Sequence, residues 1–368
     1  MYRYEEIKEV HLEITEKCQA ACPMCMRNEN GGAVNRHLSM SELSLEDCKK
    51  IFEPDFLKQL HHIYMCGNFG DPCIAQDTLE VYRYFRKHNP NMVLGMHTNA
   101  GARKAEWWGE LAEIFAGKGG VTFSVDGLED TNHLYRQNVN WDIIVRSMEA
   151  FIEAGGTAKW DYIVFEHNEH QVEEAEAFAK KLGFREFRSK KTDRFFSPSR
   201  GIVKEGHQAV DRKAKNTQLL TKPKTEKYVN KAMASKKGLL DKYGGKINYY
   251  NQAKITCKVL EGKKIFISAE GLFLPCCWTA TRMYRWWRPD KSEQIWEFIE
   301  RAGGKEGIDV INNRLEDVMN GTGFLEDIKN SWSCSSIAEG KLDVCADKCG
   351  EGFDTFSEQF AEKIDFRK

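Results

Sequence analysis

The chain has 368 residues, of which 41% are apolar, and its 54 Lys and Arg nearly balance its 55 Asp and Glu. Single cores stop growing at roughly 250–300 residues, so this length predicts one large α/β domain and a smaller one. The balanced charge excludes a global attraction to nucleic acid or membranes, and the chain has neither a signal peptide nor a long apolar run, which predicts a cytoplasmic protein.

Short β-rich runs alternate with helical patterns from Val10 to about residue 190, the order of parallel strands joined by crossover helices. Ser44 and Asp47 form a capping-box pattern at the start of one such helix. Six strands are too few to close a standard eight-stranded barrel. The expected strands are Val10–Ile14, His62–Met65, Met92–His97, Val121–Val125, Trp160–Phe165 and Phe184–Arg188.

The sequence changes character after residue 196. Residues 201–255 carry 13 Lys or Arg against 4 Asp or Glu. We therefore expect a basic helical linker or insert at 197–255, which is either a solvated face or a surface for an acidic peptide or nucleic acid. Lys263–Pro275 predicts a β-hairpin that turns at Glu270-Gly271. A carboxy-terminal amphipathic helix is predicted at 353–368, because apolar residues recur there at helical spacing: Phe353, Phe356, Phe360 and Ile364.

Twelve cysteines in a chain without a secretory signal are expected to bind metal or perform chemistry rather than form disulfides. Cys18, Cys22 and Cys25 lie within eight residues, directly after the first predicted strand. Three thiolates leave one iron of a four-iron cubane without a protein ligand, free to bind a substrate or cofactor. Zinc is the alternative, although its ligands usually come in pairs two residues apart with a fourth partner nearby.

The C-x3-C-x2-C spacing after a first strand resembles the signature of the radical S-adenosylmethionine (SAM) superfamily. The resemblance implies an α/β fold with a partial (β/α)6 TIM-like barrel, assigned here to residues 1–196. It also implies a [4Fe–4S] cluster on Cys18, Cys22 and Cys25, and reductive cleavage of SAM to methionine and a 5′-deoxyadenosyl radical. One position departs from the family, because the residue before the last cysteine is commonly aromatic there and is Met24 here.

The same resemblance assigns SAM-binding roles to residues that follow the later strands. The segment Cys66-Gly-Asn-Phe-Gly-Asp-Pro72 is similar to the family's Gly-Gly-Glu-Pro motif, in which glycines let the backbone approach the ligand closely. The alternatives are a structural ion pair between Asp126 and Arg136 and a core position for Ile163. The expected SAM-binding residues are Gly67, Gly70, Asp71, Asn99, Ser124, Asp126, Arg136 and Ile163.

Two further cysteines flank this motif. Cys66 and Cys73 are candidate hydrogen-atom donors to a substrate radical, because both lie close to where the radical would form. The alternative for each is core packing.

A second group of cysteines lies in the carboxy-terminal part of the chain. Two separated pairs, Cys257 with Cys276 and Cys345 with Cys349, suffice for a fully ligated cluster. Their spacing resembles the auxiliary domains called SPASM and twitch. The central C-x2-C-x5-C run of SPASM is absent, so we expect a twitch-like domain with one auxiliary [4Fe–4S] cluster at 256–352. A zinc ribbon is the alternative, and another cysteine could replace one of the four ligands: Cys277 or Cys334.

The resemblance implies abstraction of hydrogen from a substrate C–H bond, with two [4Fe–4S] clusters and SAM as cofactors and flavodoxin or ferredoxin as electron donor. Enzymes with such auxiliary domains mostly modify ribosomally made peptides by crosslinking, epimerisation, dehydrogenation or excision. A peptide is therefore the leading expected substrate, and a partner protein would bind its leader, since no leader-binding domain is evident. Dehydrogenation of a small alcohol or aminocyclitol is the alternative, and a non-catalytic electron carrier the remote one.

Overall fold

One mixed sheet of nine strands organises the computed structural model, which describes residues 1–197, 202–352, 354, 356 and 358–367. The strand order is β12-β11-β1-β2-β3-β4-β5-β6-β13. Strands β1 to β6 are parallel to one another. They span Glu9–Leu12 (β1), His62–Met65 (β2), Val93–Thr98 (β3), Gly119–Ser124 (β4), Ala158–Val164 (β5) and Glu186–Lys191 (β6).

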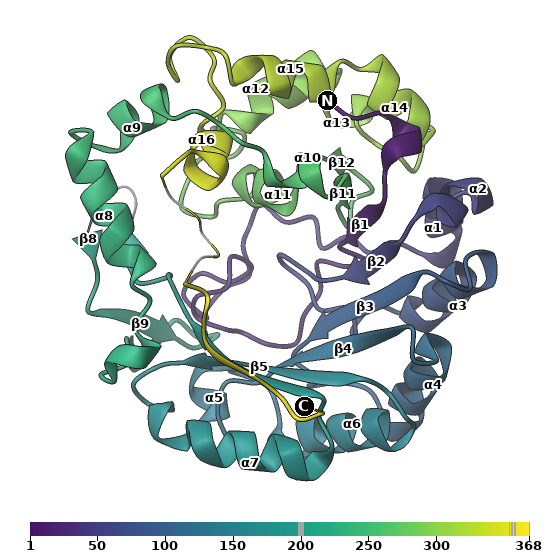
Figure 1. Ribbon diagram of the computed structural model, residues 1–368, viewed down its shortest axis with the longest axis vertical. Coiled ribbons are helices and arrows are strands. Elements are labelled where there is room, and N and C mark those ends of the chain that lie inside the picture. Colours follow the sequence, from purple (N-terminus) through teal and green to yellow (C-terminus); the bar gives the residue numbers. More distant parts are fainter. Residues whose placement is uncertain (198–201, 353, 355, 357, 368) are drawn as a thin grey trace.

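Helices between the parallel strands cover the outer, convex face of the curved sheet (Figure 1). Figure 1 also shows the helices of the carboxy-terminal part on the side of the molecule opposite strands β4 and β5. No described helix is both long enough and apolar enough to cross a membrane. The covering helices are α1 (Leu45–Ile51), α2 (Pro54–Gln59), α3 (Thr78–His88), α4 (Ala105–Phe115), α5 (Asn132–Tyr135), α6 (Trp141–Glu153) and α7 (Val172–Leu182).

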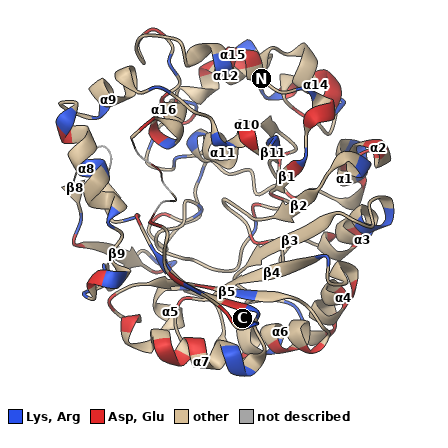
Figure 2. Ribbon diagram, in the orientation of Figure 1, with Lys and Arg blue, Asp and Glu red and all other residues tan. Residues whose placement is uncertain are grey.

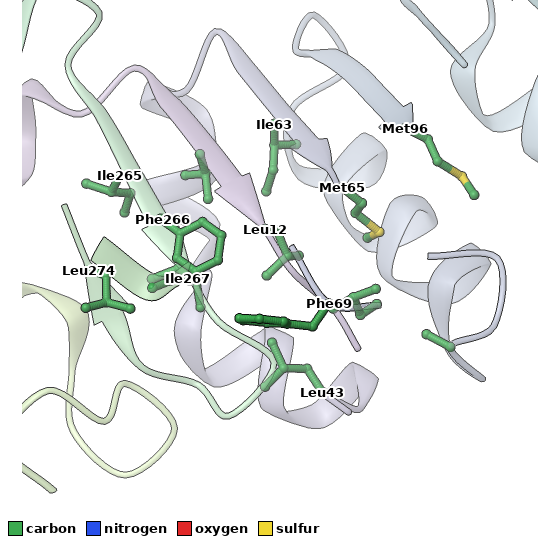
Figure 3. Packing of buried hydrophobic residues seen from close by; sticks show 14 of the residues in the cluster. Leu12, Leu43, Ile63, Met65, Phe69, Met96, Ile265, Phe266, Ile267 and Leu274 are labelled. Carbon is green, nitrogen blue, oxygen red and sulfur yellow. The ribbon is translucent and has the colours of Figure 1, made fainter. Parts of the chain in front are cut away.

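Aromatic side chains fill the layer between the sheet and these helices. Trp108 of α4 lies 5.7 Å from Phe123 of β4, and Trp160 of β5 lies 5.4 Å from Phe184, measured between ring centroids. Near the amino-terminal strands, Phe69 packs close to Leu12 and Leu43 (Figure 3). Burial of such large apolar surfaces is the main stabilising contribution to the fold.

The six predicted strands are confirmed, with ends that agree to within three residues, and they form the expected partial barrel. The predicted capping box is also confirmed, because Ser44 Oγ accepts from the amide of Asp47, and an Asp47 carboxylate oxygen accepts from the amide of Ser44. Both observations reflect local patterns, which the sequence carries without tertiary information.

The predicted hairpin at Lys263–Pro275 is present as β11 (Lys264–Ile267) and β12 (Phe273–Leu274). Gly271 in its turn has φ +75, and a Cβ there would approach the Ile311 side chain to 2.4 Å. Strand β11 pairs in parallel with β1, so the hairpin extends the barrel sheet itself. Helices that follow or precede it are α10 (Lys258–Glu261), α11 (Cys277–Met283), α12 (Ile295–Arg301), α13 (Gly304–Gly307), α14 (Leu315–Gly321), α15 (Phe324–Ser331) and α16 (Asp343–Cys349).

The predicted carboxy-terminal helix is wrong. Phe360–Asp365 forms strand β13, antiparallel to β6, and Phe353 lies outside the described residues. An open barrel leaves a row of unpaired N–H and C=O groups along β6, and pairing this edge stabilises a strand despite the helical spacing of the apolar residues. Phe360 also contacts the Arg188 guanidinium, 5.4 Å from its ring centroid.

The helical expectation for 197–255 holds only for the second half of the segment. Its first half forms two small antiparallel sheets, and two helices follow after a short 3-10 helix, η3 (Glu226–Tyr228). A turn joins β9 to β10. The Asp211 carboxylate stabilises this turn by accepting hydrogen bonds from the amides of Lys213 and Lys215. The elements are β7 (Phe196–Ser197), β8 (Ile202–Val203), β9 (Gly206–Val210), β10 (Asn216–Thr221), α8 (Ala232–Lys242) and α9 (Lys246–Gln252).

A buried charge cluster joins this segment to the carboxy-terminal helices. The carboxylate of Asp347 on α16 lies 2.8 Å from Lys236 Nζ on α8 and 3.1 Å from Arg282 Nη2 on α11. All three side chains are at most 7% exposed. Asp347 therefore holds three helices together through charges that water hardly screens.

We expect Asp347→Asn to lower the unfolding free energy by ~3–5 kcal/mol, because it removes the anion between two buried cations. The measurement is urea denaturation followed by tryptophan fluorescence. The control is Asp241→Asn, which breaks the exposed ion pair between Lys237 and Asp241 of α8. This loss should lower the unfolding free energy by about 0.5 kcal/mol or less. Equal losses in the two variants would contradict the structural role of Asp347.

Candidate functional site

A cavity of about 270 Å³ opens at the carboxyl ends of β1 to β6, and residues in the last part of these strands or in the segments that follow them line it. This is the edge at which barrels of parallel strands place their sites. Most residues predicted from the sequence meet here. Those that line the cavity are Cys18, Cys22, Cys25, Cys66, Gly67, Gly70, Asp71, Asn99, Ser124, Arg136 and Ile163.

Two of the three thiols in the loop after β1 have an N–H donor beside them. Asn99 Nδ2 lies 3.5 Å from Cys18 Sγ, and Arg136 Nη1 lies 3.8 Å from Cys22 Sγ. Burial raises the pKa of Cys22 to about 11, and the charge of Arg136 opposes this rise. Donors and a cation beside the sulfur favour the thiolate, which is the form that binds metal.

The insert after β6 holds the cysteine loop from outside. Arg212 donates to Asn28 Oδ1 at 3.0 Å and to the Gly32 carbonyl at 2.6 Å, and the amide of Val210 donates to the Asn30 carbonyl. A Cβ at Gly31 would lie 2.7 Å from the Val210 carbonyl oxygen, so this contact requires glycine. Nothing in the local sequence marks Arg212, because the contact joins segments about 180 residues apart.

The loop after β2 depends on two glycines that leave no room for a side chain. A Cβ at Gly70 would lie 1.7 Å from the Thr15 carbonyl oxygen, and one at Gly67 would lie 2.1 Å from the Gly70 carbonyl oxygen. Real Cβ atoms do not approach backbone this closely, so the loop can reach the cysteine loop only with glycine at both positions.

The Asp71 carboxylate makes hydrogen bonds to neighbouring residues of the protein. It accepts hydrogen bonds from Thr98 Oγ1 and from the amide of Asn99, each at 2.7 Å, and its own amide donates to the Lys17 carbonyl. Asp71 therefore joins the loops after β1, β2 and β3 and fixes Asn99 beside Cys18.

Glu13, which sequence reasoning missed, supports the same loop. Its carboxylate accepts from the amides of Phe69 at 2.6 Å and Gly70 at 3.2 Å. The side chain is fully buried, and this burial raises the pKa of Glu13 to about 8 although the two amides oppose the rise. An acidic residue near the carboxyl end of the predicted strand Val10–Ile14 is the one signal that could have marked it.

Asp126 and Arg136 form the ion pair that the sequence left as an alternative, with 2.6 Å between Asp126 Oδ2 and Arg136 Nε. Asp126 is fully buried and lies behind the cavity wall, where it also accepts from the amide of Ile163 at 2.6 Å. Of Asp126, Arg136 and Ile163, only Arg136 and Ile163 line the cavity. Asp126 therefore positions Arg136 and β5.

The two candidate hydrogen donors occupy different places. Cys66 lines the cavity, and burial raises the pKa of its thiol to about 12. Cys73 is fully buried in the hydrophobic core and does not line the cavity. Cavity-lining residues that the sequence did not single out are Arg27, Tyr135, Asp161, Lys190 and Arg194. Lys190 and Arg194 could have been found from their place shortly after the predicted strand Phe184–Arg188.

The second group of cysteines surrounds a narrow cavity between α10, α11 and α16. All four predicted thiols line it, whereas Cys277 and Cys334 do not: the lining thiols are Cys257, Cys276, Cys345 and Cys349. A hydrogen bond with Cys257 and the nearby Lys258 amide lower the pKa of Cys349 to about 7.

The donor chemistry of both cavities fits iron–sulfur groups, with three thiols at the first and four at the second. At the second cavity the buried indole N–H of Trp332 has no acceptor of standard geometry among the described residues. Burial raises the pKa of Cys345, and the Trp332 N–H opposes this rise, so the indole N–H is directed at the sulfur side of the cavity. Within the described part of the chain, no three His, Cys, Asp or Glu side chains converge on a single-ion site.

Comparisons with known proteins agree with this arrangement. Residues 12–179 match the family model described as the radical SAM superfamily, and no curated protein matches the sequence. The fold is similar to Streptococcus suis SuiB bound to precursor peptide SuiA, with TM-score 0.53, 13% identity, and coverage of 93% of this chain and 72% of SuiB. It is also similar to anSMEcpe with bound SAM, with TM-score 0.50, 14% identity, and coverage of 96% and 89%. A radical SAM domain implies one [4Fe–4S] cluster and SAM as cofactors.

We expect Gly70→Ala to weaken SAM binding by about 10-fold or more, because the added methyl group must push the loop away from Thr15, and overpacking of this kind typically costs ~1–3 kcal/mol. Equilibrium dialysis of cluster-loaded protein with labelled SAM measures the effect. Gly109→Ala in α4 is the control, since its Cβ would meet only Ala154 at 4.0 Å; it should bind SAM normally.

The raised pKa of Glu13 should make the stability of the protein depend on pH. Its folded-state pKa of about 8 exceeds the unfolded value of about 4.3, so the wild type loses stability as pH rises through this window. Glu13→Gln keeps the acceptor oxygen but does not titrate. Urea denaturation between pH 4.5 and 9 should show the variant gaining on the wild type until about pH 8, with no further change above. Parallel pH profiles would show that Glu13 is not protonated in the folded state.

Proposed function

We propose that this protein, whose residues 12–179 form a radical SAM domain, cleaves SAM reductively and abstracts a hydrogen atom from a peptide C–H bond. One observation carries the proposal: the three-thiol loop, the glycine loop and Arg136 meet at one cavity at the carboxyl ends of the parallel strands. An open iron position beside a cationic side chain suits a ligand with amino and carboxylate groups, such as the methionine part of SAM.

In this proposal the residues around the cavity divide the work. Cys18, Cys22 and Cys25 hold the cluster, and Arg136, kept in place by Asp126, pairs with the SAM carboxylate. The remaining contacts to SAM come from the two glycines, whose backbone can approach the ligand, and from three side chains of the later strands: Gly67, Gly70, Asn99, Ser124 and Ile163. Asp71 acts on SAM through Asn99, because its carboxylate is occupied by Thr98 and the Asn99 amide.

With cluster and SAM bound, one electron from reduced flavodoxin or ferredoxin would break the C5′–S bond of SAM and give methionine and a 5′-deoxyadenosyl radical. That radical would take a hydrogen atom from the substrate and leave as 5′-deoxyadenosine. The protein's part is to hold the substrate and to keep water away from the reacting atoms. Cys66 is suited to donate a hydrogen atom to the substrate radical, since the raised pKa of its thiol keeps the S–H hydrogen in place at neutral pH. Cys73 lies outside the cavity, so we do not assign it this role.

The four carboxy-terminal thiols would hold an auxiliary [4Fe–4S] cluster in a twitch-like domain. The Trp332 N–H, which is directed at the sulfur side of that cavity, suits a sulfur-ligated group there. This cluster would accept the surplus electron or help to hold the substrate.

A peptide substrate is supported by space beyond the SAM cavity. A cavity of about 450 Å³ and another of about 510 Å³ adjoin it, each as large as an ordinary small-molecule site of roughly 300–1,000 Å³. SuiB, which shares the fold, is described with its precursor peptide bound. A partner protein would present the leader of such a peptide.

Iron analysis tests the cofactor content. After anaerobic reconstitution with iron and sulfide, we expect about eight irons in the wild type and about four in a variant with Cys18, Cys22 and Cys25 changed to Ala. Cys334→Ala is the control, since this thiol lines neither cysteine cavity. About four irons in the wild type and none in the triple variant would refute the auxiliary cluster, and bound zinc would favour the ribbon alternative.

The same preparations test the reaction. With SAM and dithionite, the wild type should release 5′-deoxyadenosine and the triple variant should release none. A protein that carries two clusters but releases no 5′-deoxyadenosine would be an electron carrier, and the proposed activity would be wrong.

A further inference from the structure

Three adjoining cavities share the side chain of Arg194. The SAM cavity of about 270 Å³ shares Ile163 and Lys190 with the cavity of about 450 Å³, and that cavity shares Met26 and Trp287 with the one of about 510 Å³. Arg194 lines all three. A ligand that extends from the SAM cavity into either of these two outer cavities therefore passes close to this guanidinium.

The charges around the two outer cavities are mostly positive. The cavity of about 450 Å³ has six cationic side chains and two carboxylates in its wall, and the cavity of about 510 Å³ has two cations and no carboxylate among its described lining residues. The cations are Lys190, Lys191, Arg194, Arg282, Arg285 and Lys348 in the first and Arg194 and Lys204 in the second. Such walls attract an anion and repel a cationic ligand.

Most of these cations already have acidic partners. Lys190 lies 3.0 Å from Asp161, Lys191 lies 2.7 Å from Glu358, and Asp347 compensates Arg282 and Lys348. Arg285 pairs with Glu293 at 3.3 Å. These pairs reduce the charge available to a ligand, so they do not identify the recognition point.

Arg194 differs because its partners are neutral. Its Nη1 donates to the Tyr135 hydroxyl at 2.7 Å and to the Met24 carbonyl at 3.1 Å. No carboxylate among the described residues lies within ion-pair distance, and both hydrogen bonds use the same nitrogen. The guanidinium therefore keeps its positive charge and the Nε and Nη2 hydrogens for a ligand, and a carboxylate matches this donor geometry with two parallel hydrogen bonds.

Exposed aromatic rings flank the same space. Trp287 and Phe356 are each 49% exposed, and both line the cavity of about 450 Å³. Phe356 stacks on Trp278, with 5.5 Å between ring centroids. Large exposed rings in a cavity wall are typical of sites that bind peptide side chains or backbone.

The segment that contributes Lys204 to the wall of the cavity of about 510 Å³ is basic as well. Lys204, which lines the cavity of about 510 Å³, belongs to the 201–255 segment with its 13 Lys or Arg against 4 Asp or Glu. Helices α8 and α9 of this segment carry several of these Lys residues, drawn blue on the left of Figure 2. The net positive charge of this segment favours acidic ligands over basic ones.

We propose that the cavities around Arg194 bind an acidic segment of the peptide substrate, in which the carboxylate of an Asp or Glu side chain pairs with Arg194. The inference rests on the proposed function and adds the chemical class of the substrate. The pairing would hold the peptide where the SAM cavity and the two outer cavities meet, so the residue beside the acidic one would face the SAM site.

Fluorescence anisotropy with short labelled peptides tests this proposal. The peptides have blocked ends and an Ala-Gly scaffold with one Glu, or with Gln at the same position, and the protein carries its clusters and SAM. We expect the Glu peptide to bind the wild type about 10-fold more tightly than the Gln peptide, the effect of a charge-assisted hydrogen bond. In Arg194→Gln the two peptides should bind equally.

Comparison of two peptides separates recognition from a general structural effect. If Arg194→Gln only loosened the cysteine loop through Met24, both peptides would weaken by the same factor and the preference for Glu would persist. Arg301→Gln is the matched control, because Arg301 is an exposed residue of α12 paired with Asp327; it should keep the preference.

Several outcomes would overturn the proposal: equal binding of both peptides to the wild type, no binding of either, or an unchanged preference in Arg194→Gln. Competition by N-acetylglutamate amide at the concentration of the peptide would indicate a small-acid site and refute the peptide part. 5′-Deoxyadenosine release by the same preparation separates this inference from the proposed function. Release without a Glu preference refutes only the inference, and a Glu preference without release refutes only the reaction.

Discussion

Close backbone contact between the loops after β1 and β2 supports every other part of the site. Gly70 lies against the Thr15 carbonyl, and Glu13 accepts from the amides of Phe69 and Gly70. Asp71 then extends this contact to the loop after β3. Since the thiols lie in the first of these loops and Asn99 lies in the third, their relative positions depend on backbone packing that tolerates no side chain at Gly70.

Charge has two different uses in this protein. Asp126 with Arg136 and Asp347 with Lys236 are buried pairs in which each ion compensates the other, and they fix elements that would otherwise move independently. The hydrogen-bond partners of Arg194 among the described residues are neutral, and its side chain lines three cavities. A compensated charge stabilises structure, whereas an uncompensated one in a cavity is available for recognition.

The carboxy-terminal part is continuous with the barrel. Strand β11 pairs with β1, and β13 pairs with β6, so both edges of the six-stranded parallel sheet receive strands from the last third of the chain. The second group of thiols is thereby held at a fixed place relative to the first cavity. Fixed separation suits electron transfer between two redox groups, which the proposed auxiliary cluster requires.

The sequence by itself determined the six strands, the capping box, the hairpin turn at Gly271 and both groups of cysteines, because each depends on local spacing or on residue types with few alternative uses. Only the tertiary structure decided that Phe360–Asp365 is a strand, since the free edge of β6 outweighs the local helical period. It also assigned Asp126 a position behind the cavity wall and brought Glu13, Arg212 and Arg194 to the site. These roles depend on contacts between distant segments, and no local pattern records which distant segment a side chain will meet.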